Sequence, residues 1–442
     1  MRPTNFPIGS PALPRYLPVR CMKVNLAYGQ GHLAVEMTDG CTTVIEPMNR
    51  PGLPDERAAI FRALENPIGA KPLRDLIKPD SKVSISFTDI TRATPNDRII
   101  PWLLQHLAHV PRENIMLLNQ LGTHRPNTRA ELEKMLTPDV VRDYRVLNHE
   151  PENRAAHVQL GTMRDGKTPA LVNRHVVEAD VRIVTGFIEP HFFAGFSGGI
   201  KGIIPGCGAL ESVMANHGAH NIGDPSATFG VTEGNPLWEE LREVALRVGP
   251  SFILNVTLNE QRAITNVFAG DIIAAHKVGY EFVRQSAMQK VAAPFDIVVT
   301  TNSGYPLDMN LYQGVKGMSA AARIVKPGGL IILACECSEG VPGGSPLDKL
   351  LRSARSPEEI LAMLATPGFV RPEQWQAQIQ SLIQRKARVL LHSKLPDEVV
   401  KICHLTPCPD IAAAVREEMK RVGDHARVAV LPQGPLTIPY LG

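Results

Sequence analysis

Short apolar runs alternate with amphipathic stretches along most of the chain. Residues 81–95 form an alternating, β-favouring run that ends in polar turn residues, and residues 96–110 have the apolar spacing of a helix. Residues 113–136 repeat this order, and residues 180–202 open with a third apolar run that leads into a glycine-rich segment. Strands that alternate with helices in this way predict an α/β fold with mainly parallel sheets.

A further unit of the same kind begins near residue 295. Residues 295–336 favour a strand, a loop, a helix, a Pro-Gly-Gly turn and a second strand, and the polar stretch Gln285–Lys290 before them is typical of a domain boundary. A chain of 442 residues is long for one hydrophobic core. We therefore expect two α/β domains, residues 1–288 and 289–423, with the tail 424–442 returning to the first.

Composition and charge narrow the functional classes. The chain has 47 basic and 44 acidic residues, a net charge of +3, which gives no reason to expect nucleic acid or a membrane surface as a partner. Its seven cysteines do not form a disulfide framework. Prolines interrupt the first twenty residues, which we expect to be an irregular lead-in rather than a signal peptide, and the apolar runs are too short to span a bilayer. A cytoplasmic protein fits best.

Polar and titratable side chains follow the predicted strands directly. Asp89 and Arg92 come after the first strand, His124 after the second, and Glu189 and His191 after the third. In open α/β sheets, ligands bind at the carboxyl ends of the strands. We therefore expect these side chains to meet at one site.

The later unit offers a second group at the start of its helix. Gln313 and Lys316 are spaced to share one helix face, and Asp308 before them is a residue type that caps helix N-termini. The positive end of the helix dipole, together with these side chains, suits a carboxylate or a phosphate.

The glycine-rich segment after the third strand carries His191, Lys201 and His217 on a connection between a strand and a helix. It is not a Walker A loop, because Ile200 precedes the lysine and Gly202 follows it. The chain has no G-x-G-x-x-G after its first strand, and it lacks the H-E-x-x-H and paired C-x-x-C signatures of zinc sites.

Each candidate also has an ordinary structural interpretation. The alternatives are a helix cap for Asp89, a solvated surface for Arg92 and Lys316, a turn for His124, and a favourable position at a helix end for His217. Several titratable groups at strand ends, beside glycines that admit close approach, favour a functional site instead.

The motifs "DITR", "GTHRP", "PHFFAGFSGGIKGIIPG…NH" and "LYQGVK" together resemble the nickel-pincer-dependent lactate racemase family. The match spans roughly residues 85–320 in the same order and spacing, and it is most specific where Lys201 follows His191 by ten positions and His217 follows that lysine by sixteen. The resemblance implies a 2-hydroxy acid racemase or epimerase, an isomerase with its active site in the cleft between two α/β domains. It also implies nickel held by a pyridinium-3,5-bisthiocarboxylic acid mononucleotide, the nickel-pincer nucleotide.

The resemblance further implies a role for each motif residue. Lys201 would hold the cofactor through a thioamide link, and His217 would complete the nickel coordination, as imidazole suits this metal. His124 and His191 would be the acid/base pair. Two further groups are implied, namely a cofactor-binding loop of Asp89, Ile90, Thr91 and Arg92, and substrate-binding residues Arg92, Gln313, Lys316 and Trp375.

The implied chemistry explains why these residue types are needed. Removing the proton from carbon 2 of a 2-hydroxy acid is difficult beside a carboxylate, whereas hydride can leave if a cofactor carbon accepts it and a base takes the hydroxyl proton. The resulting 2-keto acid is flat and can take hydride back on its other face. The two enantiomers present their hydroxyls to opposite sides, so two bases are needed, and histidine has a pKa of about 6.5 that suits both duties.

Several alternatives stay open from the sequence. One is a nicotinamide-dependent 2-hydroxy acid dehydrogenase, which the missing dinucleotide motif disfavours, and another is a non-catalytic carrier of the cofactor. Ile200 stands where lactate-specific members have a basic residue, so malate, aryl lactates and aldonic acids are candidates beside lactate. The enzymes that synthesise the cofactor would be partners, and the oligomeric state is open, a homo-oligomer included.

Overall fold

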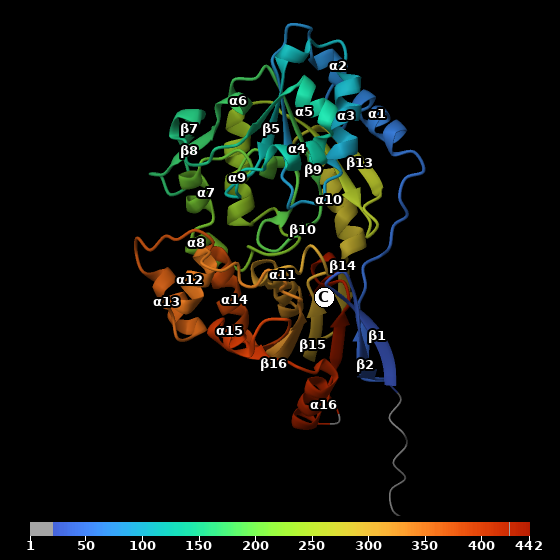
Figure 1. Cartoon of the computed structure of the whole chain (residues 1–442), viewed down its shortest axis with the longest axis vertical. Helices are drawn as coiled ribbons and strands as arrows, with labels where there is room; N and C mark the ends of the chain where they lie inside the picture. Colours follow the sequence, from blue (N-terminus) through green and yellow to red (C-terminus); the bar gives the residue numbers. More distant parts are fainter. Residues whose placement is uncertain (1–20, 424) are drawn as a thin grey trace, which may run out of the picture.

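The computed structural model describes residues 21–423 and 425–442, and its main elements surround two six-stranded sheets (Figure 1). The irregular lead-in expected before residue 21 lies outside the described residues. The strands of the first sheet, in spatial order, are β13 (Ile264–Asp271), β12 (Phe252–Leu258), β9 (Val181–Phe187), β4 (Val83–Thr88), β5 (Ile115–Gln120) and β6 (Arg145–Asn148). All neighbours pair in parallel except β12 and β13. The expected fold class is confirmed.

Helices cover both faces of the first sheet because its strands are apolar on both sides. Along β9, Ile183 packs into one core cluster and its neighbour Val184 into the other. The helices of this part are α1 (Glu56–Glu65), α2 (Leu73–Leu76), α3 (Asn96–His106), α4 (Arg129–Leu136), α5 (Pro138–Asp143), α6 (Arg174–Val177), α7 (Leu210–Asn216), α8 (Ala219–Ile222), α9 (Pro236–Val248) and α10 (Ala274–Ala287). Helices α1 to α5 pack on one face, and α6 and α9 on the other.

The second sheet is parallel throughout. Its order is β18 (Thr406–Pro407), β17 (Arg388–His392), β16 (Val325–Ala334), β15 (Phe295–Thr301), β19 (Val428–Leu431) and β3 (Thr42–Val44). One face carries α11 (Leu311–Ala322), α12 (Pro346–Arg352), α13 (Pro357–Ala365), α14 (Gln374–Lys386) and α15 (Asp397–Ile402). The other carries α16 (Ile411–Val422) and the hairpin of β1 (Cys21–Tyr28) and β2 (Gly31–Thr38).

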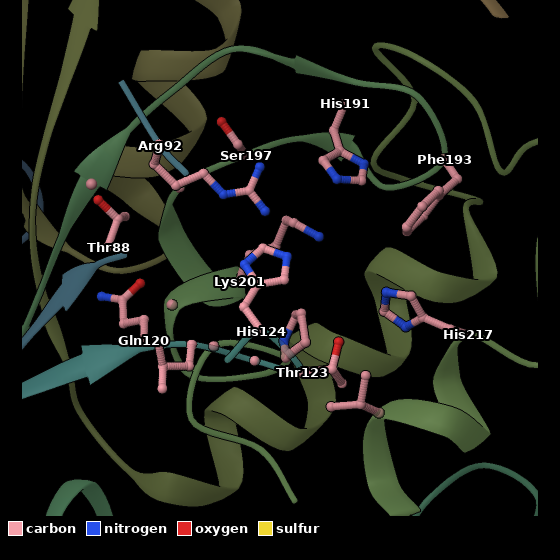
Figure 2. Close-up of a pocket in the computed structure, with 18 of the residues that line it drawn as sticks. Thr88, Arg92, Gln120, Thr123, His124, His191, Phe193, Ser197, Lys201 and His217 are labelled. Carbon is pink, nitrogen blue, oxygen red and sulfur yellow. The ribbon is translucent and has the colours of Figure 1, made fainter. Parts of the chain in front are cut away.

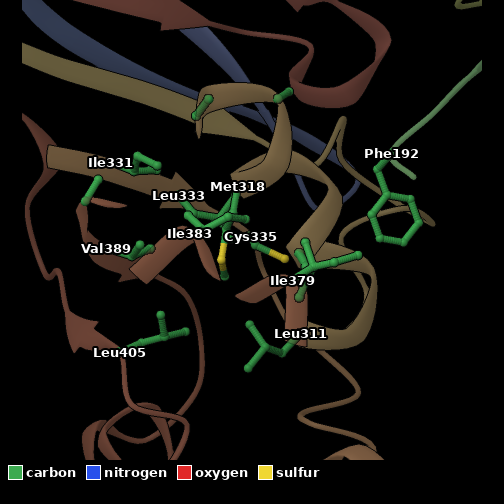
Figure 3. Close-up of a cluster of buried hydrophobic side chains, with 14 of the residues drawn as sticks. Phe192, Leu311, Met318, Ile331, Leu333, Cys335, Ile379, Ile383, Val389 and Leu405 are labelled. Atoms are coloured by element: carbon green, nitrogen blue, oxygen red, sulfur yellow. The ribbon is translucent and has the colours of Figure 1, made fainter. Parts of the chain in front are cut away.

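The largest core cluster extends from the second sheet to the loop that follows β9 (Figure 3). It joins Leu311 and Met318 of α11 and Leu333 of β16 to Phe192, which lies on the glycine-rich segment of the first part. Apolar packing therefore connects the loop that follows β9 to the helix layer of the second sheet.

Strand pairing contradicts two expectations about how the ends of the chain are placed. The tail was expected to return to the first domain, but β19 pairs with β15 in the second sheet, and β20 (Ile438–Leu441) pairs with β14 (Met288–Val291). Residues 21–44 were expected in the first domain, but β3 forms the edge of the second sheet beside β19. The ladder positions beside β15 and β19 supply the backbone partners that these end segments need. A boundary at residue 288 stays a prediction.

The topology brings the expected strand ends together. From β4 the chain continues to β5 and β6 on one side, whereas β9 and β12 lie on the other, so the order reverses between β4 and β9. A crevice forms at the carboxyl ends of the strands at such a point, and ligands bind there in open α/β sheets. In the part of the chain that the structure describes, no helix combines the length and apolar character that crossing a membrane requires.

Candidate active site

One pocket gathers most of the predicted site residues (Figure 2). Those that line it are Arg92, His124, His191, Lys201, His217, Gln313, Lys316 and Trp375. They come from the ends of β4, β5 and β9, from the glycine-rich segment, and from α11 and α14 above the second sheet. The rings of His124, His191 and His217 face the open space into which the Lys201 side chain extends (Figure 2).

The glycine-rich segment folds back on itself before it delivers Lys201. After β9, the short strands β10 (Pro190–His191) and β11 (Gly195–Phe196) pair, and the 3-10 turn η3 (Gly199–Gly202) holds the lysine. Gly198 and Gly199 have φ values of 75° and 53°, which disfavour any other residue type. Ile200 points into a core cluster and is fully buried, so the residue before the lysine does not line the pocket.

Lys201 lies among positive and neutral groups. Burial, together with the charges of Arg92 and Lys316, lowers the pKa of its amine to about 7. The amine lies 5.6 Å from the centre of the Phe193 ring. A substantial part of Lys201 is therefore uncharged at neutral pH, which makes its amine a nucleophile.

His217 ends α7 as its C-terminal cap and is 4% exposed. Its ring contacts the edges of Phe193 and Trp375, with centroids 5.0 and 5.1 Å away. Burial, with the nearby Lys201 charge, lowers the pKa of His217 to about 3, and its buried Nδ1 has no hydrogen-bond partner. The ring is therefore neutral, the form in which imidazole binds a metal.

His191 is held at the β10–β11 turn. The Ala194 N–H donates to its Nδ1 at 3.2 Å, and its ring lies against Phe192 and Phe193. Burial lowers the pKa of His191 well below its ordinary value, and the charge of Lys201 adds to the effect. This imidazole is also neutral.

Asp89 holds His124 rather than capping a helix. Its carboxylate lies 2.9 Å from Nδ1 of His124 and accepts the Thr91 hydroxyl at 3.0 Å. Burial works to raise the pKa of Asp89, but the hydrogen bond and charge of His124, together with Arg92, keep it below its ordinary value. The residue before α3 is Pro95, which makes no side-chain cap, so the capping interpretation of Asp89 is wrong.

Three residues of the predicted cofactor loop do not line the pocket. Asp89 is 3% exposed behind His124, Thr91 donates to Asp89, and the backbone N–H of Ile90 donates to Asn127 at 3.3 Å. Of this loop, Arg92 alone lines the pocket. The loop therefore contacts the pocket through Arg92 and, indirectly, through the Asp89–His124 pair.

Helix α11 presents Gln313 and Lys316, but its cap differs from the prediction. Asn310 is the N-terminal cap, and its side chain accepts the Gln313 N–H at 3.1 Å. Asp308 is fully buried and instead accepts the backbone N–H of Gly29, in the turn of the β1–β2 hairpin, at 2.7 Å. The expectation that Asp308 caps this helix is therefore wrong.

The pocket end of α11 is positively charged. Burial lowers the pKa of the Lys316 amine to about 8, and the neighbouring charge of Arg92 contributes. Burial raises the pKa of Glu189, although Lys316 and Arg92 oppose this. The Oε1 atom of Gln313 is buried without a partner. Lys316 and Arg92 suit a small carboxylate that would accept their hydrogen bonds and balance their charge, whereas the Gln313 oxygen is itself an acceptor and suits a donor such as a hydroxyl group.

The sequence did not indicate several residues of the pocket. Tyr312 accepts a hydrogen bond from the Trp375 indole N–H at 3.1 Å and so fixes this ring beside His217. Polar wall residues that the motifs did not single out are Thr88, Gln120, Thr123, Thr185, Ser197 and Gln376. Thr88, Gln120 and Thr123 close or follow predicted strands, and that position is the signal that would have found them. Ser197 lies within the glycine-rich segment and Gln376 in α14, where no strand end was predicted.

Among the described residues, no group of three or more His, Cys, Asp or Glu side chains is arranged to hold a metal ion. His217 is a single buried imidazole donor that faces the pocket. A metal at this position would therefore take one ligand from His217 and the others from a bound group.

Comparison with known proteins gives consistent matches along the chain. Residues 28–230 match the family model of the lactate racemase N-terminal domain, and residues 290–438 match that of the lactate racemase C-terminal domain. Lactate racemase from Thermoanaerobacterium thermosaccharolyticum is 35% identical over 419 residues, covering 93% of this chain and 97% of the relative. Lactate racemase from Lactiplantibacillus plantarum is 36% identical over 383 residues, covering 86% and 90%.

A solved structure agrees with these matches. The lactate racemase apoprotein from Thermoanaerobacterium thermosaccharolyticum has a TM-score of 0.88 at 34% identity, covering 95% of this chain and 100% of that chain. Both family models, both relatives and this structure therefore support the same assignment. The chain belongs to the lactate racemase family and is an isomerase of the racemase class.

Proposed function

We propose that this racemase inverts carbon 2 of a 2-hydroxy acid, with His124 and His191 as its acid/base pair. The observation that carries the proposal is the meeting of both imidazoles with Lys316 and Gln313 in one pocket. Lactate, which its relatives are named for, is the first candidate substrate. Malate, aryl lactates and aldonic acids follow, because Ile200 is buried in the core and gives no substrate contact by which to choose among them.

The substrate carboxylate would bind Gln313 and Lys316, with Arg92 beside them. Lys316 and Arg92 repel each other across a partly desolvated pocket, which is one reason why the pKa of Lys316 is lowered to about 8. An anion between them removes that penalty and keeps Lys316 charged. The carboxylate end of the substrate is thereby fixed, and carbon 2 is directed toward the histidines.

His124 is prepared to act as a base. Because Asp89 is ionised and 2.9 Å from Nδ1, it accepts the Nδ1–H, and the lone pair of neutral His124 is left on Nε2. The carboxylate also stabilises the imidazolium that forms when Nε2 takes the hydroxyl proton.

His191 starts in the opposite tautomer. In this ring orientation its Nδ1 accepts the Ala194 N–H, so the proton of the neutral ring is on Nε2. To act as a base at Nε2, His191 has to carry its proton on Nδ1 and give up the Ala194 bond. The two imidazoles therefore differ in this structure, because Nε2 of His124 has a free lone pair whereas Nε2 of His191 carries the proton.

The residues present fit a nickel-pincer nucleotide. Lys201 would attach it, with its pKa of about 7 leaving part of the amine nucleophilic, and His217 would bind the nickel through its neutral imidazole. Gly198 and Gly202 also line the pocket, and a Cβ on either would collide with Asn255 or with Val184, so only glycine lets the backbone lie this close to them. When bound, this group would supply a carbon that accepts hydride from carbon 2 and returns it to either face of a 2-keto acid.

The decisive experiment uses protein produced in a host that also has the cofactor-synthesising enzymes. Each enantiomer of lactate, labelled with deuterium at carbon 2, is followed by chiral chromatography and mass spectrometry. We expect interconversion with the label largely kept at carbon 2, because hydride transfer would not release the label to water as proton abstraction from carbon 2 would. Loss of the label to solvent at every turnover would contradict hydride transfer, and net oxidation that depends on added NAD would indicate a dehydrogenase.

His124→Ala tests the acid/base assignment. We expect kcat to fall by roughly 10²–10⁴, about 3–5 kcal/mol, with the cofactor still attached. An unchanged kcat would remove His124 from this role. If no 2-hydroxy acid is turned over while the cofactor is bound, the carrier alternative holds.

Lys201→Ala tests the attachment by intact mass. The wild-type chain should carry the added mass of the cofactor, and the variant should lack it. A variant that still carries the mass would show that the link is made elsewhere.

A further inference from the structure

The loop that carries Lys201 rests on a buried histidine that no sequence motif indicated. His276, on α10, is 1% exposed, and its Nε2 lies 2.8 Å from the carbonyl oxygen of Ser197. Burial lowers the pKa of His276 to about 4, against the effect of the Ser197 bond. The ring is therefore neutral at pH 7, and its N–H on Nε2 donates to Ser197.

The same ring occupies the space beside Gly199. Gly199 has a φ of 53°, and a Cβ added there would overlap the His276 imidazole. On its other side, the Gly199 N–H donates to Oδ1 of Asn255 at 2.7 Å, and Asn255 is fully buried on β12. His276 and Asn255 therefore fix the backbone at Ser197 and Gly199 from two different elements.

This restraint determines where the lysine points. The backbone N–H of Lys201 donates to Gly198 at 3.2 Å, so the direction of its side chain depends on the conformation two and three residues earlier. Gly198, Gly199 and Gly202 have no Cβ to limit their conformations, and glycine loses more freedom on ordering than any other residue. A loop of this composition needs contacts from outside to keep one shape.

We propose that His276 is a positioning residue that holds residues 197–202 so that the Lys201 amine projects into the pocket for cofactor attachment. The consequence for attachment rests on the proposed role of Lys201 as the tether. The restraint of the loop does not, because it concerns the protein without its cofactor.

The chain offers a matched control in His149. This histidine is fully buried, its pKa is lowered to about 4 by burial, and its Nε2 bonds the carbonyl of Gly208 at 2.9 Å. Gly208 lies seven residues beyond Lys201 in the same segment. Loss of His149 therefore removes a similar buried hydrogen bond without releasing the part of the loop before the lysine.

The first test is hydrogen–deuterium exchange of the apoprotein, read on peptides that cover residues 195–206. His276→Ala should make exchange at Gly199 roughly tenfold faster, the change expected when about 1.4 kcal/mol of local stability is lost. His276→Gln should restore slow exchange, because its amide nitrogen can take the place of Nε2. His149→Ala should leave this exchange as in the wild type.

His276→Asn covers the case in which the alanine variant does not fold. Its amide is too short to reach Ser197, so it should behave as His276→Ala is expected to. Exchange at wild-type speed in a folded His276→Asn or His276→Ala variant would overturn the proposal. Equal acceleration by His149→Ala would also overturn it, because the effect would then be general loosening.

The second test measures, by intact mass, the fraction of chains that carry the cofactor after production with the cofactor-synthesising enzymes. This fraction should fall several-fold in His276→Ala, recover in His276→Gln and stay unchanged in His149→Ala. An unmodified wild type would contradict the tether proposed for Lys201, and the exchange experiment would then still decide whether His276 holds the loop. A fully modified His276→Ala chain would overturn the positioning role.

Discussion

Asp89 and His124 form the residue pair on which the proposed acid/base chemistry depends most directly. The carboxylate accepts Nδ1–H of His124 at 2.9 Å and leaves Nε2 free to act as a base. In Asp89→Asn, the amide can donate to Nδ1 instead, which moves the proton of His124 to Nε2. We expect kcat to fall by roughly 10²–10⁴ in both directions, measured by steady-state kinetics on each enantiomer.

Cofactor content distinguishes this role from the one the family resemblance implied for Asp89. If Asp89 acts through His124, the Asp89→Asn chain should carry as much cofactor as the wild type by intact mass. A loss of bound cofactor in proportion to activity would favour the cofactor-binding role, and a kcat within twofold of the wild type would contradict both.

At the scale of residues, the sequence predicts where a side chain lies in the fold better than it predicts which side chains contact one another. Arg92, His124 and His191 follow three predicted strands, and parallel strands bring such positions to one edge. The Asp89–His124 contact joins residues 35 positions apart, and a helix cap was an equally good explanation of an aspartate after a strand. His276 lies in the first turn of α10 with no motif around it, so its contact with Ser197 is visible only in three dimensions.

At the scale of elements, the start of α11 positions Gln313 at the end of the pocket proposed to bind the substrate carboxylate. Asn310 caps this helix, so Asn310→Ala should lower the free energy of unfolding by about 1 kcal/mol in urea titrations. Fraying of the first turn would also move Gln313, so we expect KM to rise more than kcat falls. A larger effect on kcat than on KM would contradict this view of the helix start as a binding element.

Asp308→Ala provides a comparison at a position two residues away. Its carboxylate accepts the backbone N–H groups of Gly29 and Glu336, so its loss leaves buried donors without partners. We expect a cost of about 1–3 kcal/mol per donor, more than for Asn310→Ala. If Asn310→Ala proves the more damaging of the two, Asp308 is not the contact that holds the hairpin turn.

The wrong assignment of this cap shows what local patterns leave undecided. Asp308 and Asn310 are both capping residue types, and the sequence before α11 has no feature that selects one. The choice is made by the β1–β2 hairpin, whose Gly29 binds Asp308 from 279 positions away. The helices and strands themselves were easier to predict. The segments at β4 and α3, β5 and α4, and β15 and α11 each change from the apolar spacing of a strand to that of a helix.

At the scale of the whole molecule, the fold class follows from alternating strands and helices, whereas the placement of the chain ends does not. Strands β19 and β3 are short, four and three residues, and carry no pattern that distinguishes one parallel sheet from another. β19 pairs at the free edge of β15, and β3 pairs at the edge that β19 then presents, so both edges exist only once the second sheet has formed. Which sheet edge a short strand joins depends on the edges that the rest of the fold leaves free. The residues of the strand itself do not identify that edge.

Buried neutral histidines should make the apoprotein sensitive to acid. Burial lowers the pKa of His149 and His276 to about 4 and that of His217 to about 3, whereas an unfolded histidine has a pKa of about 6.5. Between these values the unfolded chain binds more protons than the folded one, so the stability is fully present above about pH 6.5 and is lost as the pH falls toward 4. Urea unfolding across this range measures the slope of the free energy of unfolding against pH. In His149→Gln this slope should decrease by up to about 1.4 kcal/mol per pH unit, the contribution of one proton. A slope that His149→Gln leaves unchanged would mean that this histidine is charged in the folded state or already neutral in the unfolded one.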